Sequence, residues 1–416
     1  MPRNKFISIP HFESFKNKSH DNTYYQLIKN SSQEFKDEIH DIYFGKIFRY
    51  QHEGKEKRYC NPMGVEATDA QVDGLFRIQN EFGIEISLTI NSIETPHEIL
   101  WVEKILKEFI SFIKSFYDRG LRSCTIGSPH LIKSRLLHEN FPEMRWKNTV
   151  NHRVADAQQV INFICCGYDT ILLDRSISRN LNELRRIRKA VDYYNKKYKP
   201  AKKILTSLLI QEGCLYCCPF KKEHDSIGEY ISGEYFNTLS KLTCDNWRFT
   251  EPFGGLPRNA IDLIASDKKT FNEFAELNDI FKYSGRFSVF SFHPDDVEDK
   301  RACWLFEHKK KYRFDYVPFA PEDTIYANNM TDVINDNIMP LHWWNFGWVD
   351  TDMVQSDYKN RLELLKEMPN FWKTDKGKRL EKILKTCRSQ CWDCHECEKT
   401  FGTPQFDSAL QLQGKR

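Results

Sequence analysis

Residues 170 to 210, TILLDRSISRNLNELRRIRKAVDYYNKKYKPAKKILTSLLI, contain the strand–helix–strand unit that decides the fold. Thr170–Leu173 and Ile204–Ile210 are short apolar runs of the kind that form buried strands. Between them, Asn180–Tyr198 has apolar residues at helical spacing. Parallel strands need a long crossover, usually a helix, so this stretch predicts a parallel β/α unit.

The same alternation extends along the chain from about residue 35 to residue 310. Further strands are predicted at Ile39–Phe44, Ile84–Ile90, Arg122–Ile126 and Asp279–Tyr283. Further helices are predicted at Ala67–Phe82, Pro96–Tyr117 and around Ala155–Cys165. The number of units approaches eight, which favours an α/β protein of the TIM-type (β/α)8 barrel class. A doubly wound open sheet is the alternative, because periodicity does not show whether a sheet closes.

We predict three regions in the chain. Residues 1–290 form most of the barrel, and residues 291–386 complete it and carry an aromatic-rich insertion that includes LHWWNFGWV at 341–349. A cluster of Trp residues is usually a core or a lid, and a base-stacking platform is the alternative. Within this region Phe371–Leu384 has the pattern of a basic amphipathic helix. Residues 387–416 form a cysteine-rich extension with a polar tail.

The composition gives few hints of a partner. Lys and Arg number 61 against 58 Asp and Glu, so the net charge of +3 indicates no strongly charged partner. No apolar run reaches the roughly 18 residues of a membrane span, and the N-terminal residues lack the apolar region of a signal peptide. We therefore expect a cytoplasmic protein without a membrane partner.

Thirteen cysteines in a reducing compartment indicate metal ligation or buried thiols rather than disulfides. Cys124, Cys165 and Cys166 lie in apolar runs, and we predict that they belong to the core.

One cysteine cluster follows the strand Ile204–Ile210 directly, in the loop QEGCLYCCPFKKEH at 211–224. Cys214 and Cys218 have C-x3-C spacing, and Cys244 lies in a polar context further on. Thiolates are soft ligands that suit zinc or an iron–sulfur cluster, and either needs three or four of them. The alternative is a structural turn with a buried thiol.

A second cluster lies near the C-terminus and comprises Cys387, Cys391, Cys394 and Cys397. Its compact spacing is closer to iron–sulfur sequences than to zinc fingers, although zinc stays open as an alternative. It contains the C-x3-C-x2-C pattern of radical S-adenosylmethionine enzymes. However, it follows a predicted helix instead of a first barrel strand, so radical chemistry is a third hypothesis.

Polar residues gather where predicted strands end, and in β/α folds the carboxyl ends of the strands form the functional face. No P-loop, G-x-G-x-x-G or H-E-x-x-H motif is present. We predict Glu212, His224 and Asp174 as catalytic residues. Arginine can clamp a carboxylate or phosphate through paired N–H groups, and internal ion pairs are the alternative role. The predicted substrate-binding residues are Asn91, Arg175, Arg179, Lys282 and Arg286.

The order of these motifs resembles the collagenase-like peptidase family, U32, and its TIM-barrel relatives, over roughly residues 35–290. The resemblance rests on DRSISRN at 174–180, EGC-x3-CPF-x3-H at 212–224 and DIFK-x2-GR at 279–286. It implies a barrel that carries a 4Fe–4S cluster, with Cys214 and Cys218 as ligands and Cys244 as a plausible third. Relatives take part in tRNA and ubiquinone hydroxylation.

Two features depart from the family pattern. The family's first, N-terminal ligand has no clear counterpart, although Cys60 is a candidate. The C-terminal cluster lies beyond the family's ligand set, so it either completes one shared cluster or holds a second metal. No protease constellation is visible.

We therefore expect an iron–sulfur barrel enzyme that hydroxylates, or changes by related redox chemistry, a small-molecule, peptide or RNA substrate, with an electron donor as partner. The alternative is a non-catalytic module, stapled by metal, that binds RNA or protein.

Overall fold

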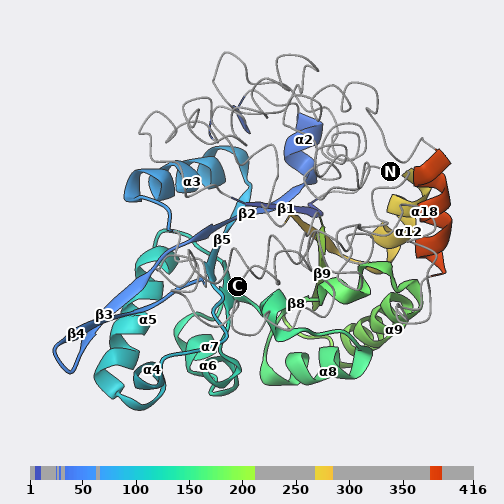
Figure 1. The fold of residues 1–416 in the computed structure, drawn as a ribbon. Coiled ribbons are helices and arrows are strands. Elements are labelled where there is room, and N and C mark those ends of the chain that lie inside the picture. The colour runs from blue at the N-terminus through green and yellow to red at the C-terminus, as the bar shows by residue number, and fades with distance from the viewer. Residues whose placement is uncertain are drawn as a thin grey trace, which may run out of the picture.

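The computed structural model describes residues 5–10, 25, 28–29, 33–61, 66–210, 268–283 and 375–386. Eight parallel strands form a closed barrel in chain order, and the last strand pairs with the first (Figure 1). The predicted (β/α)8 barrel is confirmed, and the open sheet is excluded. The strands are β1 (Ile7–Pro10), β2 (Ile39–Gly45), β5 (Glu85–Ile90), β6 (Ser123–Ile126), β7 (Arg145–Lys147), β8 (Thr170–Leu172), β9 (Leu205–Ile210) and β10 (Ile280–Tyr283).

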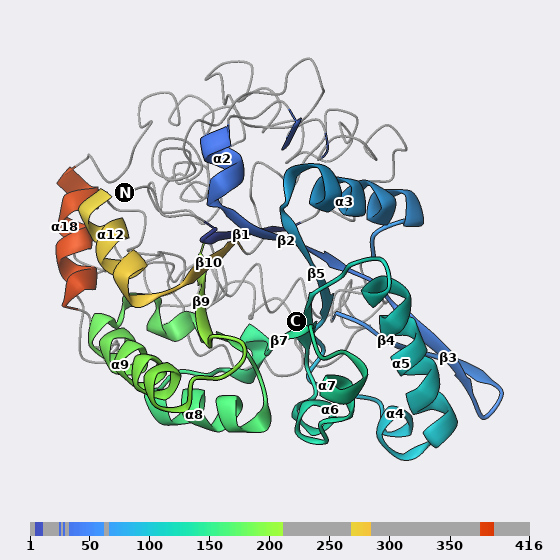
Figure 2. The same cartoon turned by 180° about the vertical axis from the view of Figure 1, so that it is seen from behind.

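Helices surround the barrel, as both views show (Figures 1 and 2). Several of their ends have sequence-encoded caps. Thr68 and Gln71 form a capping box at the start of α3, and Gly83 ends this helix in the left-handed conformation. The helices are α2 (Gln33–Glu38), α3 (Asp69–Phe82), α4 (His97–Trp101), α5 (Glu103–Tyr117), α6 (Pro129–Lys133), α7 (Leu136–Asn140), α8 (Ala157–Cys166), α9 (Leu181–Tyr198), α12 (Lys268–Leu277) and α18 (Asp375–Lys385).

The main hydrophobic core lies between the outer face of the barrel and these helices. Helix α5 shows how the sequence builds this core. Its buried residues recur at helical spacing, so they share one face of the helix: Ile105, Phe109, Ile113 and Phe116. Full burial of one such side chain stabilises the fold by about 1.5–3 kcal/mol. The outward-facing strand residues they meet are also apolar, for example Phe44, which contacts Phe116.

Six predicted strands are present, each with one end shifted by one residue. β1 and β7 are strands that the sequence pattern did not predict. The predicted helix Pro96–Tyr117 is two helices, α4 and α5. They are separated at Val102, whose backbone is extended (φ −105°, ψ 106°).

A hairpin that the sequence analysis missed follows β2. Its strands β3 (Phe48–His52) and β4 (Lys55–Tyr59) extend outward beside α5 (Figures 1 and 2). Glu53 and Gly54 have φ of +52° and +73°, as a two-residue hairpin turn requires. The Glu-Gly pair was the available signal.

The predicted basic helix at Phe371–Leu384 is confirmed as α18, which lies beside α12 in both views (Figures 1 and 2). Among the described residues, no helix has the length and apolar character needed to cross a membrane. Of the predicted core thiols, Cys124 is fully buried and Cys166 partly so. The prediction for Cys165 is wrong: it is exposed, because it lies one residue beyond buried Ile164 and so turns away from the core.

Candidate functional site

The carboxyl ends of the eight strands open at one end of the barrel, which we call the mouth. Asn91 follows β5 directly at the mouth, and its buried Oδ1 has no hydrogen-bond partner among the described residues. Gly127 follows β6, and a Cβ there would lie 2.0 Å from the carbonyl oxygen of Ser92. The backbone segments that follow β5 and β6 therefore touch, and only glycine fits at position 127.

Cys60 also lies at the mouth. It follows β4, and its carbonyl oxygen accepts a hydrogen bond from the amide of Ser92 (3.1 Å). Its thiol donates to the carbonyl oxygen of Asn61 (3.1 Å), and burial raises its pKa. The structure thus brings the candidate cluster ligand next to predicted site residue Asn91.

Asp174 and Arg175 follow β8 at the same end of the barrel. The carboxylate of Asp174 accepts the amide of Ser176 (2.7 Å) and caps the short 3-10 helix Arg175–Arg179. Asp174 is held in place by this cap and by its own amide, which donates to Val154. Of Arg179, only the backbone is described.

Lys282 is the second-last residue of β10, and its Nζ lies 3.8 Å from the ring centroid of Tyr43. β10 and β2 both flank β1. The contact therefore passes over the inner surface of β1, and Lys282 points into the barrel.

The remaining predicted residues lie outside the described part of the chain. They are Glu212, His224 and Arg286, and the cysteines Cys214, Cys218, Cys244, Cys387, Cys391, Cys394 and Cys397.

The inner wall of the barrel is strongly polar. Lys147 on β7 donates a hydrogen bond to Asp41 on β2 across two intervening strands, which shows that both side chains point inward. Side chains alternate along a strand, and residues in register share a face. The inward polar residues are Ser8, Asp41, Tyr43, Glu85, Ser87, Thr89, Ser123, Thr125, Arg145, Lys147, Thr170, Ser207 and Lys282.

This interior departs from the usual TIM barrel, which Val, Ile and Leu fill. Its apolar part includes a small cluster of Leu172, Leu209 and nearby Val150. The buried hydroxyls of Thr89 and Thr125 have no hydrogen-bond partner among the described residues. On the side of β2, β5 and β6, the barrel therefore encloses polar atoms from the amino ends of the strands to the mouth.

Asp41 is the centre of the interior network and is completely buried. Lys147 donates to its Oδ2, and Ser8 donates to its Oδ1. Burial by itself would raise the pKa of this carboxyl, but Lys147, His40 and Ser8 outweigh burial and hold it at about 2. Asp41 is therefore ionised.

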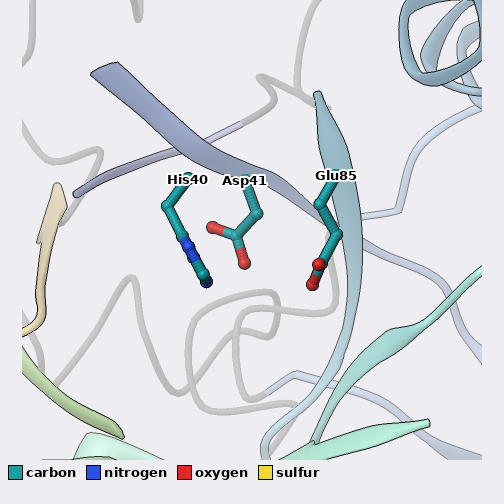
Figure 3. Close-up of side chains that lie close together, drawn as sticks. All are labelled: His40, Asp41 and Glu85. Atoms are coloured by element: carbon teal, nitrogen blue, oxygen red, sulfur yellow. The ribbon is translucent and has the colours of Figure 1, made fainter. Parts of the chain in front are cut away.

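His40 joins this network through a β-bulge. Ile7 pairs with Ile39 and Ser8 with Asp41, so His40 is an extra residue opposite β1. A bulge turns two successive side chains toward the same side. His40 and Asp41 accordingly project together toward the region that Glu85 also faces (Figure 3).

The ligand atoms of His40, Asp41 and Glu85 all lie within 4.8 Å of one another. Sequence analysis missed all three and Lys147. The available signals were charged residues inside IHDIYF and the alternation in EISLTI, where every second side chain is polar.

No protein-family model matches the chain, and no curated protein does. One solved structure with a similar fold is that of the U32 peptidase Mk0906. The TM-score is 0.42 with 11% sequence identity, over 68% of this chain and 93% of that one. The barrel assignment rests on the strand pairing above, not on this likeness.

Proposed function

We propose that the chain is an enzyme that binds and modifies its substrate at the mouth of the barrel. The observation that supports this most is the polar interior that continues to the mouth, where Asn91, Asp174 and Lys282 lie at or just after the ends of three strands. TIM-barrel enzymes carry their active sites at this end of the strands. The ammonium group of Lys282 would attract a carboxylate or phosphate of a small-molecule, peptide or RNA substrate.

For the chemistry, we propose hydroxylation or a related redox reaction that depends on a 4Fe–4S cluster. Cys60 fits such a cluster because it lies at the mouth beside Ser92. Cys214 is four residues beyond Ile210, the end of β9, and four residues span at most about 14 Å. Cys218 and Cys244 would complete the ligand set, and a bound cluster would supply electrons from a donor or hold the substrate.

The C-terminal cysteines, Cys387, Cys391, Cys394 and Cys397, would hold a second cluster or contribute to the first. Zinc is the alternative metal there. α18 ends at Lys385, so Cys387 follows this helix almost directly.

Anaerobic purification followed by iron and sulfide counts and a visible spectrum tests this proposal. Cys214→Ala and Cys60→Ala should each lose the iron and the broad visible absorbance of the cluster at the mouth, whereas Cys165→Ser, at an exposed helix position, should lose neither. Cys394→Ala then shows whether the C-terminal cysteines hold separate iron. A colourless protein that holds only zinc would overturn the redox reading.

Substrate binding at the mouth has its own test, which does not depend on iron. Lys282→Met should weaken binding of anionic candidate substrates while iron content stays unchanged. Lys133→Met, at the C-terminal end of α6, is the matched control. Unchanged binding in the Lys282 variant would contradict the proposal that the substrate binds at the mouth.

A further inference from the structure

The cluster of His40, Asp41 and Glu85 is separate from the mouth. Glu85 is the first residue of β5 and His40 the second of β2, so the cluster lies near the amino ends of the strands. Ile90, at the mouth, is five positions beyond Glu85, which corresponds to about 16 Å along a strand. The proposed function uses none of these side chains.

Two atoms of the cluster lack partners although they are buried. His40 Nε2 and Glu85 Oε1 make no hydrogen bond within the described residues, and Glu85 forms no ion pair there. A buried polar atom without a partner is costly, and each such atom in a folded protein calls for an explanation. Both atoms belong to side chains that project to the same side of the strands as Asp41 (Figure 3).

The charges of the cluster suit a cation. An unprotonated imidazole offers a nitrogen lone pair to a metal ion. Lys147 balances the charge of Asp41 in a direct ion pair, whereas the carboxylate of Glu85 forms no ion pair among the described residues.

The geometry is also close to that of a metal site. Three ligand atoms that all lie within 4.8 Å of one another share a point at most about 2.8 Å from each, so shifts of about 0.6–0.8 Å would give the 2.0–2.2 Å of zinc bonds to imidazole nitrogen and carboxylate oxygen. The hydrogen bonds from Ser8 and Lys147 fix the Asp41 carboxylate, and each oxygen retains a further lone pair. Such second contacts orient ligands in many metal sites.

We propose that His40, Asp41 and Glu85 bind one divalent transition-metal ion of the zinc type inside the barrel. An imidazole ligand favours such ions over Mg²⁺ and Ca²⁺, which prefer oxygen ligands alone. This site is independent of the cysteines and of the proposed redox chemistry.

Cobalt(II) titration of the full-length protein, after dialysis against a chelator, tests the site. Cobalt bound by nitrogen and oxygen gives weak visible bands, whereas cobalt bound by cysteine adds strong near-ultraviolet charge-transfer bands. We expect one equivalent with the nitrogen–oxygen signature. Its affinity should fall at least about tenfold in Glu85→Gln and in His40→Ala, because even outer contacts of metal ligands cost that much.

His97→Ala is the matched control, since His97 is exposed on α4 and should leave the titration unchanged. Circular dichroism checks that each variant is folded. If His40→Ala does not fold, the nearly isosteric Glu85→Gln is sufficient for the test. The proposal is overturned if folded Glu85→Gln binds cobalt as the unaltered protein does. It is equally overturned if every equivalent carries thiolate bands, or if Mg²⁺ competes as well as Zn²⁺.

Discussion

Gly127 follows β6 at the point where the chains leaving β5 and β6 touch. Its own backbone is not left-handed, so glycine is required there for space and not for conformation. Gly127→Ala would place a Cβ 2.0 Å from the Ser92 carbonyl oxygen, and backbone atoms must move. We expect a loss of about 3 kcal/mol or more in the free energy of unfolding, measured by urea titration.

Gly83→Ala is the comparison for this prediction. Gly83 has φ +68° but nothing near its Cβ position, so the loss should be only about 1 kcal/mol. Equal losses in the two variants would show that contact with Ser92 is not what excludes a side chain at Gly127.

His152 makes stability depend on pH. Burial lowers its pKa to about 4, although the hydrogen bond from Nε2 to the carbonyl oxygen of Gly127 (2.9 Å) acts in the opposite direction. The unfolded chain takes up a proton near pH 6.5 and the folded chain only near pH 4, so stability falls as pH is lowered between these values. The full loss should be roughly 3 kcal/mol.

Urea unfolding between pH 7 and pH 4 measures this loss. His152→Gln should flatten the curve over that window, because no group then takes up the proton on unfolding. A variant that keeps the full pH dependence would assign it to other groups.

At the scale of the elements, β7 and β8 are joined through a side chain. They share a single register pair, Lys147 with Thr170. Asn148 extends the ladder, since its Oδ1 accepts the amide of Leu172 (2.5 Å) and its Nδ2 donates to the carbonyl oxygen of Leu172 (3.2 Å). The side-chain amide of Asn148 therefore continues the hydrogen bonding of the short strand β7 in place of a backbone amide.

Asn148→Ala should lower the free energy of unfolding by about 2–4 kcal/mol, because it leaves a buried backbone N–H and C=O unpaired. Asn140→Ala removes an exposed amide that bonds the Leu136 carbonyl, and it should change stability by no more than about 0.5 kcal/mol. Chemical unfolding of the two variants side by side measures the difference. A small loss at Asn148 would mean that water satisfies Leu172.

At the scale of the whole molecule, the Asp41–Lys147 pair links strands β2 and β7 across the interior of the barrel. Lys147→Met would leave a buried carboxylate without its cation and should cost about 3–5 kcal/mol. The double variant Asp41→Leu with Lys147→Met should recover most of that loss, since replacing both partners by apolar groups is often neutral. Thermal and urea unfolding of the single and double variants complete the cycle.

The pair also has a defined pH window. The pKa of Asp41 in the folded protein is about 2, below its value of 3.8 in the unfolded chain. Its contribution is therefore complete above pH 4 and is lost as the pH falls toward 2.

A double variant as unstable as Lys147→Met would show that the cost arises from packing and not from the charge of Asp41.

The sequence by itself determined the parallel β/α class and most of its elements. The strand–helix alternation at 170–210 is a local pattern, and apolar periodicity reports which side of an element is buried. The sequence also identified Asn91, Asp174 and Lys282 as residues at strand ends. This follows from chain order alone, because each lies at or just after the end of a predicted strand.

Only the tertiary structure decided what the barrel contains. Lys147 and Asp41 are 106 positions apart, and neither the closure of the sheet nor the bulge that turns His40 inward is visible in local periodicity. Charged residues in a predicted strand fit a solvent-facing surface equally well. Closing eight strands places those same residues in a shielded interior, where an ion pair and a candidate metal site become possible.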